Sequence, residues 1–230
     1  MGKSNQKSES GFQEKSMATA NQEIPTMKAL QPILKPYTRA STRKAILQLT
    51  NSLIPYILLF ALMVWSLRFS YWFTLPLSIP AALFMVRIFI LFHDCGHNSL
   101  FPSLKANRWV GFFLGIITFT PSEQWWRTHA IHHATSGNLD KRGIGDVATW
   151  TVAEYKSKTK LQRLGYRLFR NPLVMFGLGP IWMFIMSHRL PTPFVGKREA
   201  RFQWLHNLGL AVVIIALGLT IGWKEYVLVQ

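Results

Sequence analysis

Five of the seven histidines in the chain form two clusters. His93 and His97 are four residues apart, so a helix would place both imidazoles on one face, at the end of a long apolar run. His129, His132 and His133 have spacings of three and four and would also share a helical face. Neutral imidazole binds zinc, copper, iron and nickel. One such pair is weak evidence, but two clusters beside apolar segments predict one shared metal site.

Three polar residues near the clusters have two open interpretations. Asp94 either accepts a hydrogen bond from an imidazole or is a solvated acid at a helix end. Asn138 and Asp146 either support the metal site, directly or through water, or act in capping and turns, which ordinary propensity favours. We expect no catalytic residue outside the metal site. Trp125 and Trp126 are predicted to be anchors at a membrane interface.

Composition indicates a membrane protein rather than a soluble one. The chain has 230 residues, of which 49% are hydrophobic, and a mean hydropathy of +0.15. The net charge of +16 is spread along the chain without a nucleic-acid-binding motif, so we expect no nucleic-acid partner. Basic segments beside apolar spans are better explained by attraction to membrane lipid. The single cysteine excludes an internal disulfide framework.

Three regions follow from the pattern of polarity. Residues 1–25 are predicted to be a disordered polar tail, and residues 26–51 an interfacial segment interrupted by prolines. Residues 52–230 are predicted to be the membrane domain. Its apolar runs cover residues 52–67, 71–92, 172–187 and 204–223. The predicted fold class is therefore an all-α polytopic membrane protein with about four transmembrane helices and a cytoplasmic helical cap that binds metal.

The short apolar run at residues 109–119 decides whether the two clusters can meet. Its 11 residues are too few to cross a bilayer, so we interpret it as re-entrant or interfacial. Both clusters then lie on one side of the membrane. Residues 1–51 and 93–171 carry 8 and 11 Lys and Arg, against 1 and 4 in residues 68–70 and 188–203. This bias predicts that the histidines face the cytoplasm, in the bacterial inner membrane.

Local signals predict the helix that carries the second cluster. Thr120 is expected to be its N-cap, with Pro121 at the first helical position and Glu123 completing a capping box. The helix should run through the three histidines and end near Gly137. His188 and His206 lie at the edges of the last two apolar runs and are predicted to be simple interfacial histidines.

The spacing His93-x-x-x-His97 followed by His129-x-x-His132-His133 resembles the first two histidine boxes of the membrane-bound fatty acid desaturases. The surrounding sequences HDCGHNSLF, WRTHAIHHATSGN and GDV are similar to bacterial acyl-lipid desaturases of the omega-6 (delta-12) type. The resemblance implies a centre of two iron ions held by histidines, with O₂ as co-substrate. It also implies an acyl-lipid substrate, a cis double bond as product, and a ferredoxin or cytochrome b5-type electron donor.

The chain departs from this family in one respect. A third box, another His-x-x-His-His, follows the last span in the family and is absent here. We therefore expect a C-terminally truncated fragment, with five of the ligands and no activity by itself. Two alternatives stay open: a membrane di-iron hydroxylase or ketolase with similar boxes, and a bis-histidine haem electron carrier. The second would place lone histidines facing one another inside apolar spans.

Overall fold

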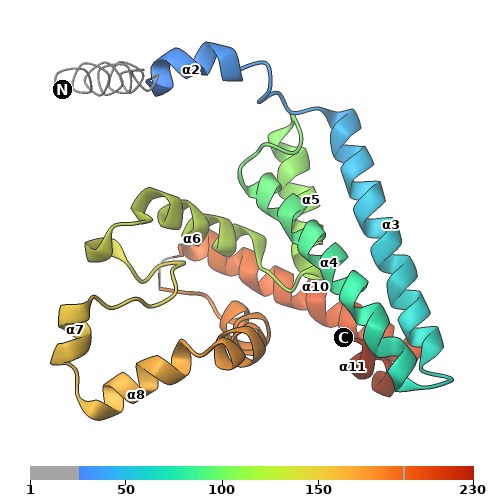
Figure 1. Cartoon of the computed structure of the whole chain (residues 1–230). Helices are drawn as coiled ribbons and strands as arrows, with labels where there is room; N and C mark the ends of the chain where they lie inside the picture. Colours follow the sequence, from blue (N-terminus) through green and yellow to red (C-terminus); the bar gives the residue numbers. More distant parts are fainter. Residues whose placement is uncertain (1–25, 194) are drawn as a thin grey trace, which may run out of the picture. The chain divides into compact units, whose positions relative to one another are not determined.

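The computed structural model describes residues 26–193 and 195–230, and every regular element in these ranges is helical (Figure 1). The chain divides into two compact units, Met1–Arg39 and Ala40–Gln230. Within the first unit, the described residues contain one helix, α2 (Met27–Leu34). The predicted disordered tail at 1–25 lies outside the described residues. All elements discussed below belong to the second unit.

Two long helices form an antiparallel hairpin, α3 (Thr42–Ser66) and α4 (Tyr71–Gly96) (Figure 1). The Ser66 and Thr74 hydroxyls share a buried hydrogen bond of 2.7 Å near the turn. Further along, Arg87 donates a 2.8 Å hydrogen bond to Asn51 across the pair, which satisfies a charge within an apolar helix. α3 begins at Thr42, so the last ten residues of the predicted interfacial segment 26–51 form the start of this helix.

Three helices in the described residues are long and apolar enough to cross a membrane: α3, α4 and α10 (Lys197–Ile221). A fourth candidate is a bent pair, in which α8 (Lys160–Phe169) meets the helical segment Val174–Arg189 at 60°. That segment consists of η2 (Val174–Leu178), α9 (Gly179–Ile181), η3 (Trp182–Met186) and η4 (Ser187–Arg189). The predicted fold class is therefore confirmed.

The short helices lie between and after these spans. α5 (Leu104–Ile117) has 14 residues and is not among the candidate spans, in agreement with the interpretation of the run at 109–119. α6 (Ser122–Thr135) follows it. The remaining elements are η1 (Leu139–Lys141), α7 (Val152–Ser157) and α11 (Trp223–Val229). Gly222, at φ +97°, makes the turn from α10 into α11, a conformation that favours glycine.

The predicted start of α6 was wrong by one residue. Pro121 occupies the cap position without a side-chain hydrogen bond, and the helix begins at Ser122. The Thr120 hydroxyl instead donates a 2.9 Å hydrogen bond to the carbonyl of Thr118. Thr120 is completely buried beneath α5, so its side chain serves the tight α5–α6 turn rather than the helix terminus.

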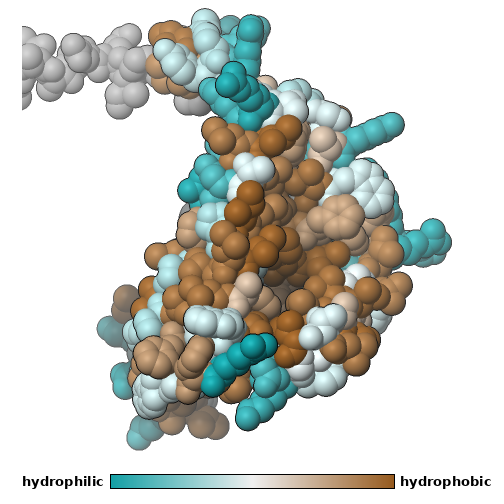
Figure 2. Space-filling model, turned by 90° about the vertical axis from the view of Figure 1, so that its right-hand side faces the viewer, coloured by the Kyte–Doolittle hydropathy of each residue, from teal (hydrophilic) through white to brown (hydrophobic). Residues whose placement is uncertain are grey.

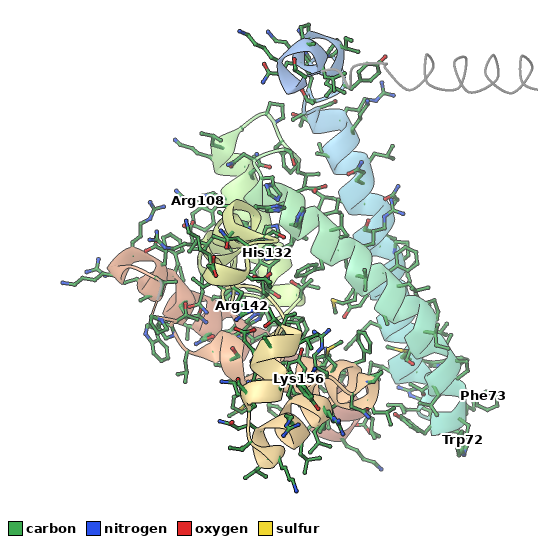
Figure 3. The ribbon with its side chains drawn as sticks, turned by 60° about the vertical axis from the view of Figure 1, so that its left-hand side comes forward. Trp72, Phe73, Arg108, His132, Arg142 and Lys156 are labelled. Carbon is green, nitrogen blue, oxygen red and sulfur yellow. The ribbon has the colours of Figure 1, made fainter. Side chains whose placement is uncertain are left out.

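The core gathers around the C-terminal half of α4. Ile88, Phe92 and Cys95 are almost completely buried, together with Leu114 of α5. Apolar side chains also dominate the outer surface on the α3 side of the molecule (Figure 2). Trp72 and Phe73 are exposed at the turn end of the hairpin, far along α4 from the histidines (Figure 3). The packed core thus surrounds the last turns of α4, next to the first histidine pair.

Candidate metal centre

Four imidazoles from two helices converge on one point. His93 and His97 come from the C-terminal end of α4, and His129 and His133 from α6. Nε2 of His97 lies 3.2 Å from Nε2 of His93 and 3.3 Å from Nε2 of His129. Nε2 of His133 lies 2.9 Å from Nε2 of His129. One ligand atom from each residue falls within 4.8 Å of all the others.

These separations fit the coordination sphere of one metal ion. Metal–imidazole bonds of about 2.0–2.1 Å place neighbouring ligand nitrogens about 2.8–3.4 Å apart across octahedral and tetrahedral geometries. The Nε2–Nε2 distances of 2.9, 3.2 and 3.3 Å lie in this range. His97 and His133 are exposed while His93 and His129 are half-buried, so one side of the cluster is open to a further ligand.

The cluster favours neutral imidazoles. Burial, and then the neighbouring histidines His93 and His133, lower the pKa of His129 to about 4. Burial and the same two neighbours also lower the pKa of His97, against an opposing effect of Asp94. Both side chains therefore have unprotonated nitrogens near neutral pH, the form that binds a metal cation.

A tryptophan that sequence reasoning assigned to the membrane interface instead positions α6. The Trp126 indole is half-buried between α4 and α5, and its Nε1 donates a 3.3 Å hydrogen bond to the carbonyl of Phe92. A Cβ added at Gly96 would lie 2.3 Å from this indole, and one at Gly111 would lie 2.4 Å from it. The two glycines thus form a slot for the ring, three residues before His129. Gly96 lies between His93 and His97. A glycine inside the histidine pair is a sequence signal that another side chain packs closely against the helix there.

The neighbouring Trp125 also packs against aromatic rings of the protein. Its ring stacks on His129 at 4.3 Å between centroids and 18° between planes. It also contacts Phe89 of α4 edge to face, with 5.3 Å between ring centroids. The half-buried Trp125 therefore restricts the rotation of the His129 ring and excludes water from one side of it.

α4 ends at Gly96, with His97 at its C-cap, because of the loop that follows. Asn98 adopts φ +55°, which stops the helix and is tolerated by asparagine. Asn107 of α5 is completely buried and binds both backbone groups of Phe101, accepting from its N–H at 2.9 Å and donating to its carbonyl at 2.7 Å. This folds the loop against α5 and fixes where the helix carrying His93 and His97 stops.

His132 does not join the four converging nitrogens. Its Nδ1 lies 2.7 Å from Oδ1 of Asp146, a close polar contact although the ring nitrogen is not aligned for a hydrogen bond. Gly145 adopts φ +75°, and a Cβ there would be 2.9 Å from the Cβ of His132. The close approach of Gly145 therefore lets Asp146 reach the ring. Figure 3 labels His132 on α6.

The other two predicted supporting residues differ in their surroundings. Asp94 Oδ1 lies 3.2 Å from Nδ1 of His93, on the ring atom opposite to the one in the cluster. Asn138 accepts a 2.9 Å hydrogen bond from the backbone N–H of Asp140 and caps η1. Within the described residues, no hydrogen bond joins Asn138 to a histidine.

The remaining two histidines are not simple interfacial residues. His206 has an exposed fraction of 1% and contacts the Phe112 ring edge to face at 6.0 Å. The Nδ1 of His188 is also buried, and the carbonyl of His188 accepts a hydrogen bond from Gln203. Both histidines belong to the packing between α10, α5 and the end of the segment before it. His206 is therefore a packing residue, because α5 covers α10 at this point.

Comparison with known proteins identifies the family. Residues 69–229 match the family model described as fatty acid desaturase, and this range includes all five histidines of the two clusters. The chain belongs to the fatty acid desaturase family. A fatty acid desaturase of Bacillus subtilis is 43% identical over 194 residues, covering 84% of this chain and 55% of the relative. The comparison with solved structures gave no match.

More distant relatives have more specific names. An sn-1 acyl-lipid omega-3 desaturase (ferredoxin) of Synechocystis is 32% identical over 163 residues, covering 66% of this chain and 44% of the relative. An sn-1 oleoyl-lipid 12-desaturase of Arthrospira platensis is 28% identical over 155 residues, covering 66% and 43%. The similarity to 12-desaturases is therefore only distant. The chain spans about half the length of these relatives.

Proposed function

We propose that the protein to which this chain belongs is an O₂-dependent acyl-lipid desaturase that introduces a cis double bond into a membrane acyl chain. The observation that carries the proposal is the convergence of four histidine Nε2 atoms from α4 and α6 at metal-ligand separations. The family match supports the reaction class, and the three candidate spans support a lipid substrate.

The reaction requires a metal because no amino-acid side chain can remove hydrogen from an unactivated alkyl chain. When bound, iron would supply the activation of O₂. The overall change is balanced by removing two hydrogens from adjacent carbons and reducing O₂ to two waters with two further electrons and two protons. The electrons must come from an external donor, for which we propose a ferredoxin or a cytochrome b5-type protein. The name of the Synechocystis relative supports a ferredoxin.

Within this scheme each side chain has a proposed role. His93, His97, His129 and His133 would hold one iron ion. His132, which points to a different partner, is proposed as a ligand of a second iron, whose other ligands would have to come from outside these two clusters. Asp94 and Asp146 would orient imidazoles through their Nδ1 atoms, since each carboxylate lies next to one. A carboxylate on Nδ1 leaves Nε2 free for the metal. For Asn138, capping of η1 is the better-supported role.

The position of the cluster suits a substrate that arrives from the bilayer. The histidines lie at the end of a membrane helix, above the buried ring of Phe92, and are shielded on one side by Trp125. We propose that this end of α4 faces the cytoplasm, as the distribution of basic residues predicts. A lipid tail could then reach the metal without crossing water, while a soluble donor reaches the open side of the cluster.

The geometry disfavours a bis-histidine haem. Two axial imidazoles on opposite faces of a haem are separated by two iron–nitrogen bonds, about 4 Å, with the porphyrin ring between them. Neighbouring Nε2 atoms in the cluster are only 2.9–3.3 Å apart. The cluster also gathers four imidazoles, whereas a bis-histidine haem takes two.

Lipid analysis of cells that express the complete gene tests the proposal. We expect a new cis double bond in membrane acyl chains, and its loss in His97→Ala and His129→Ala variants that still accumulate in the membrane. Arg201→Gln, an exposed substitution on α10, serves as a matched control that keeps the product. An oxygenated chain without a new double bond would instead indicate the hydroxylase or ketolase. A Soret band in the purified protein would indicate haem.

A further inference from the structure

A second surface, independent of the metal centre, is formed by α7, α8 and the residues that flank them. It surrounds a shallow hollow of about 660 Å³. We call it the basic–aromatic surface, and its members are Trp150, Tyr155, Lys156, Arg163, Tyr166, Arg167 and Arg170. Three aromatic rings and four cations therefore line one depression. Figure 3 labels Lys156 on α7 and Arg142 at the end of η1, the element before α7.

The aromatic rings hold the surface together. Trp150 and Tyr166 stack at 4.4 Å with 10° between their planes, and the Tyr166 hydroxyl accepts a 3.3 Å hydrogen bond from the backbone N–H of Trp150. Arg167 donates a 2.6 Å hydrogen bond to the Tyr155 hydroxyl, and the guanidinium of Arg163 lies 5.9 Å from the Tyr155 ring centroid. Ring stacking, hydrogen bonds and cation–π contacts thus hold these side chains in place around the hollow.

The cations of this surface have no anionic partner within residues 26–193 and 195–230. No carboxylate in these ranges forms an ion pair with Lys156, Arg163, Arg167 or Arg170. The acid closest in sequence, Glu154, is already engaged by Arg142 and by the capping box of α7. Nε of Arg163 is buried without a hydrogen-bond partner. The surface therefore carries an unbalanced positive charge that an external anion would satisfy.

An apolar strip runs along the same helix. Leu161, Leu164 and Leu168 recur at helical spacing and have exposed fractions of 78%, 52% and 54%. In the helical projection this strip lies opposite Tyr166, which faces the rest of the chain, and next to the cations. α8 also leads directly into the apolar segment Val174–Arg189, from which it is bent by 60°. A basic amphipathic helix in this position is the type that lies in a membrane interface.

We propose that α8 lies on the membrane surface, with its leucine strip among the acyl chains, and that the basic–aromatic surface binds the phosphate headgroup of an anionic phospholipid. A continuous membrane span through α8 would bury four of its cations, Lys160, Arg163, Arg167 and Arg170, which is unfavourable. An acidic protein would satisfy the cations but would leave the leucines in water. An anionic bilayer satisfies both, and aromatic rings stacked beside cations suit the headgroup layer.

Binding of a fluorescent phosphatidylglycerol to the full chain in neutral detergent micelles tests the headgroup site. The variant Arg163→Gln/Arg170→Gln removes two cations and keeps the Arg167–Tyr155 bond. We expect its affinity to fall on the order of tenfold. The control Lys197→Gln/Arg201→Gln removes the same charge from exposed positions of α10 and should leave the affinity within about twofold, since screening makes distant exposed charges contribute little. Fluorescent phosphatidylcholine should bind weakly to all three proteins.

Four outcomes would overturn the proposal. Equal affinities in the two double variants would mean that the hollow is not the lipid site. Equal binding of phosphatidylcholine would mean that charge recognition plays no part. Full displacement of the lipid by a similar concentration of inorganic phosphate would indicate a soluble anion site rather than a membrane contact. Retained lipid binding with loss of binding to an acidic electron donor would indicate a protein-docking surface instead.

Depth measurements test the placement of the helix without removing a charge from the hollow. A nitroxide is attached at Leu164→Cys or at Lys160→Cys in nanodiscs that contain phosphatidylglycerol. Cys95, with an exposed fraction of 1%, should not be labelled. We expect the label at 164 to be relaxed mainly by membrane-dissolved O₂, and the label at 160 mainly by a water-soluble nickel chelate. A label at 164 that is as accessible to nickel as the label at 160 would contradict the proposal, whatever the activity of the enzyme.

Discussion

The metal centre and the basic–aromatic surface are positioned in opposite ways. At the centre, the Trp126 ring fills a slot so tight that a Cβ at Gly111 would lie 2.4 Å from it. On α8, a Cβ at Gly165 would meet no atom within 4 Å. The first region fixes imidazole nitrogens by close packing, whereas the second presents charge and leucines on an open helix. Substitutions should therefore affect metal binding sharply in the first region and lipid contact gradually in the second.

The largest contrast is expected between two histidines of the same helix. His129 has Nε2 neighbours on two sides, at 3.3 Å to His97 and 2.9 Å to His133, so His129→Ala should abolish metal binding by the cluster. His132→Ala should leave one ion bound by the four converging residues. Metal analysis of the purified variants measures this directly. Equal metal loss in both variants would contradict a separate role for His132.

Filling the indole slot should have the next largest effect. Gly111→Ala forces the Trp126 ring or α5 to move and should lower the free energy of unfolding by about 1–3 kcal/mol, as overpacking does elsewhere. Gly165→Ala on α8 is the matched control and should be neutral or stabilising by up to about 1 kcal/mol, because alanine favours a helix. Thermal unfolding in detergent compares the two. The same destabilisation in both would show that the slot is not specially tight.

A smaller effect is expected at the carboxylate beside His132. Asp146→Asn keeps the size of the side chain but removes its charge, so it should weaken a metal bound through His132 by roughly 10–100-fold. The four-histidine ion should be unaffected. Isothermal titration with a divalent metal can separate the two sites. Unchanged affinity at both would mean that Asp146 serves only the turn formed with Gly145.

The smallest effect is expected at the edge of the basic–aromatic surface. The backbone N–H of Thr151, and then Arg142, lower the pKa of Glu154. Because the folded pKa is lower than the unfolded one, the carboxylate contributes stability above its ordinary pKa, and this contribution is lost as the pH falls through the folded value. Glu154→Gln should therefore reduce stability slightly at neutral pH and make no difference in strong acid. Thermal unfolding against pH provides the measurement.

The sequence was sufficient for the features that depend on periodicity. The helical spacing of the histidines and the length of the apolar runs predicted the fold class, and the brevity of the run at 109–119 predicted that α5 does not span. Features that depend on contacts between distant segments were missed. Tryptophans near an apolar run, such as Trp125 and Trp126, are typical of interfacial anchors. Their packing against α4 and α5 depends on contacts that the local sequence does not show.

The same limit explains the other differences. His206 lies in an apolar run, and nothing local shows that α5 will cover it. Thr120 and Pro121 have the residue types of a helix start, but the buried α5–α6 turn uses the Thr120 hydroxyl for its own carbonyl. In each case packing between distant segments overrides the local propensity. A single sequence does not show which segments will pack together.

X-ray absorption at the iron edge tests the central claim most directly, when it is measured on the complete protein in its iron-loaded form and on its His129→Ala variant. The α4–α6 cluster predicts several imidazole nitrogens in the first coordination sphere of the iron, and the loss of that signal together with the bound iron in the variant. An iron-loaded protein whose spectrum and iron content are unchanged by His129→Ala would contradict the assignment of the cluster as the metal centre.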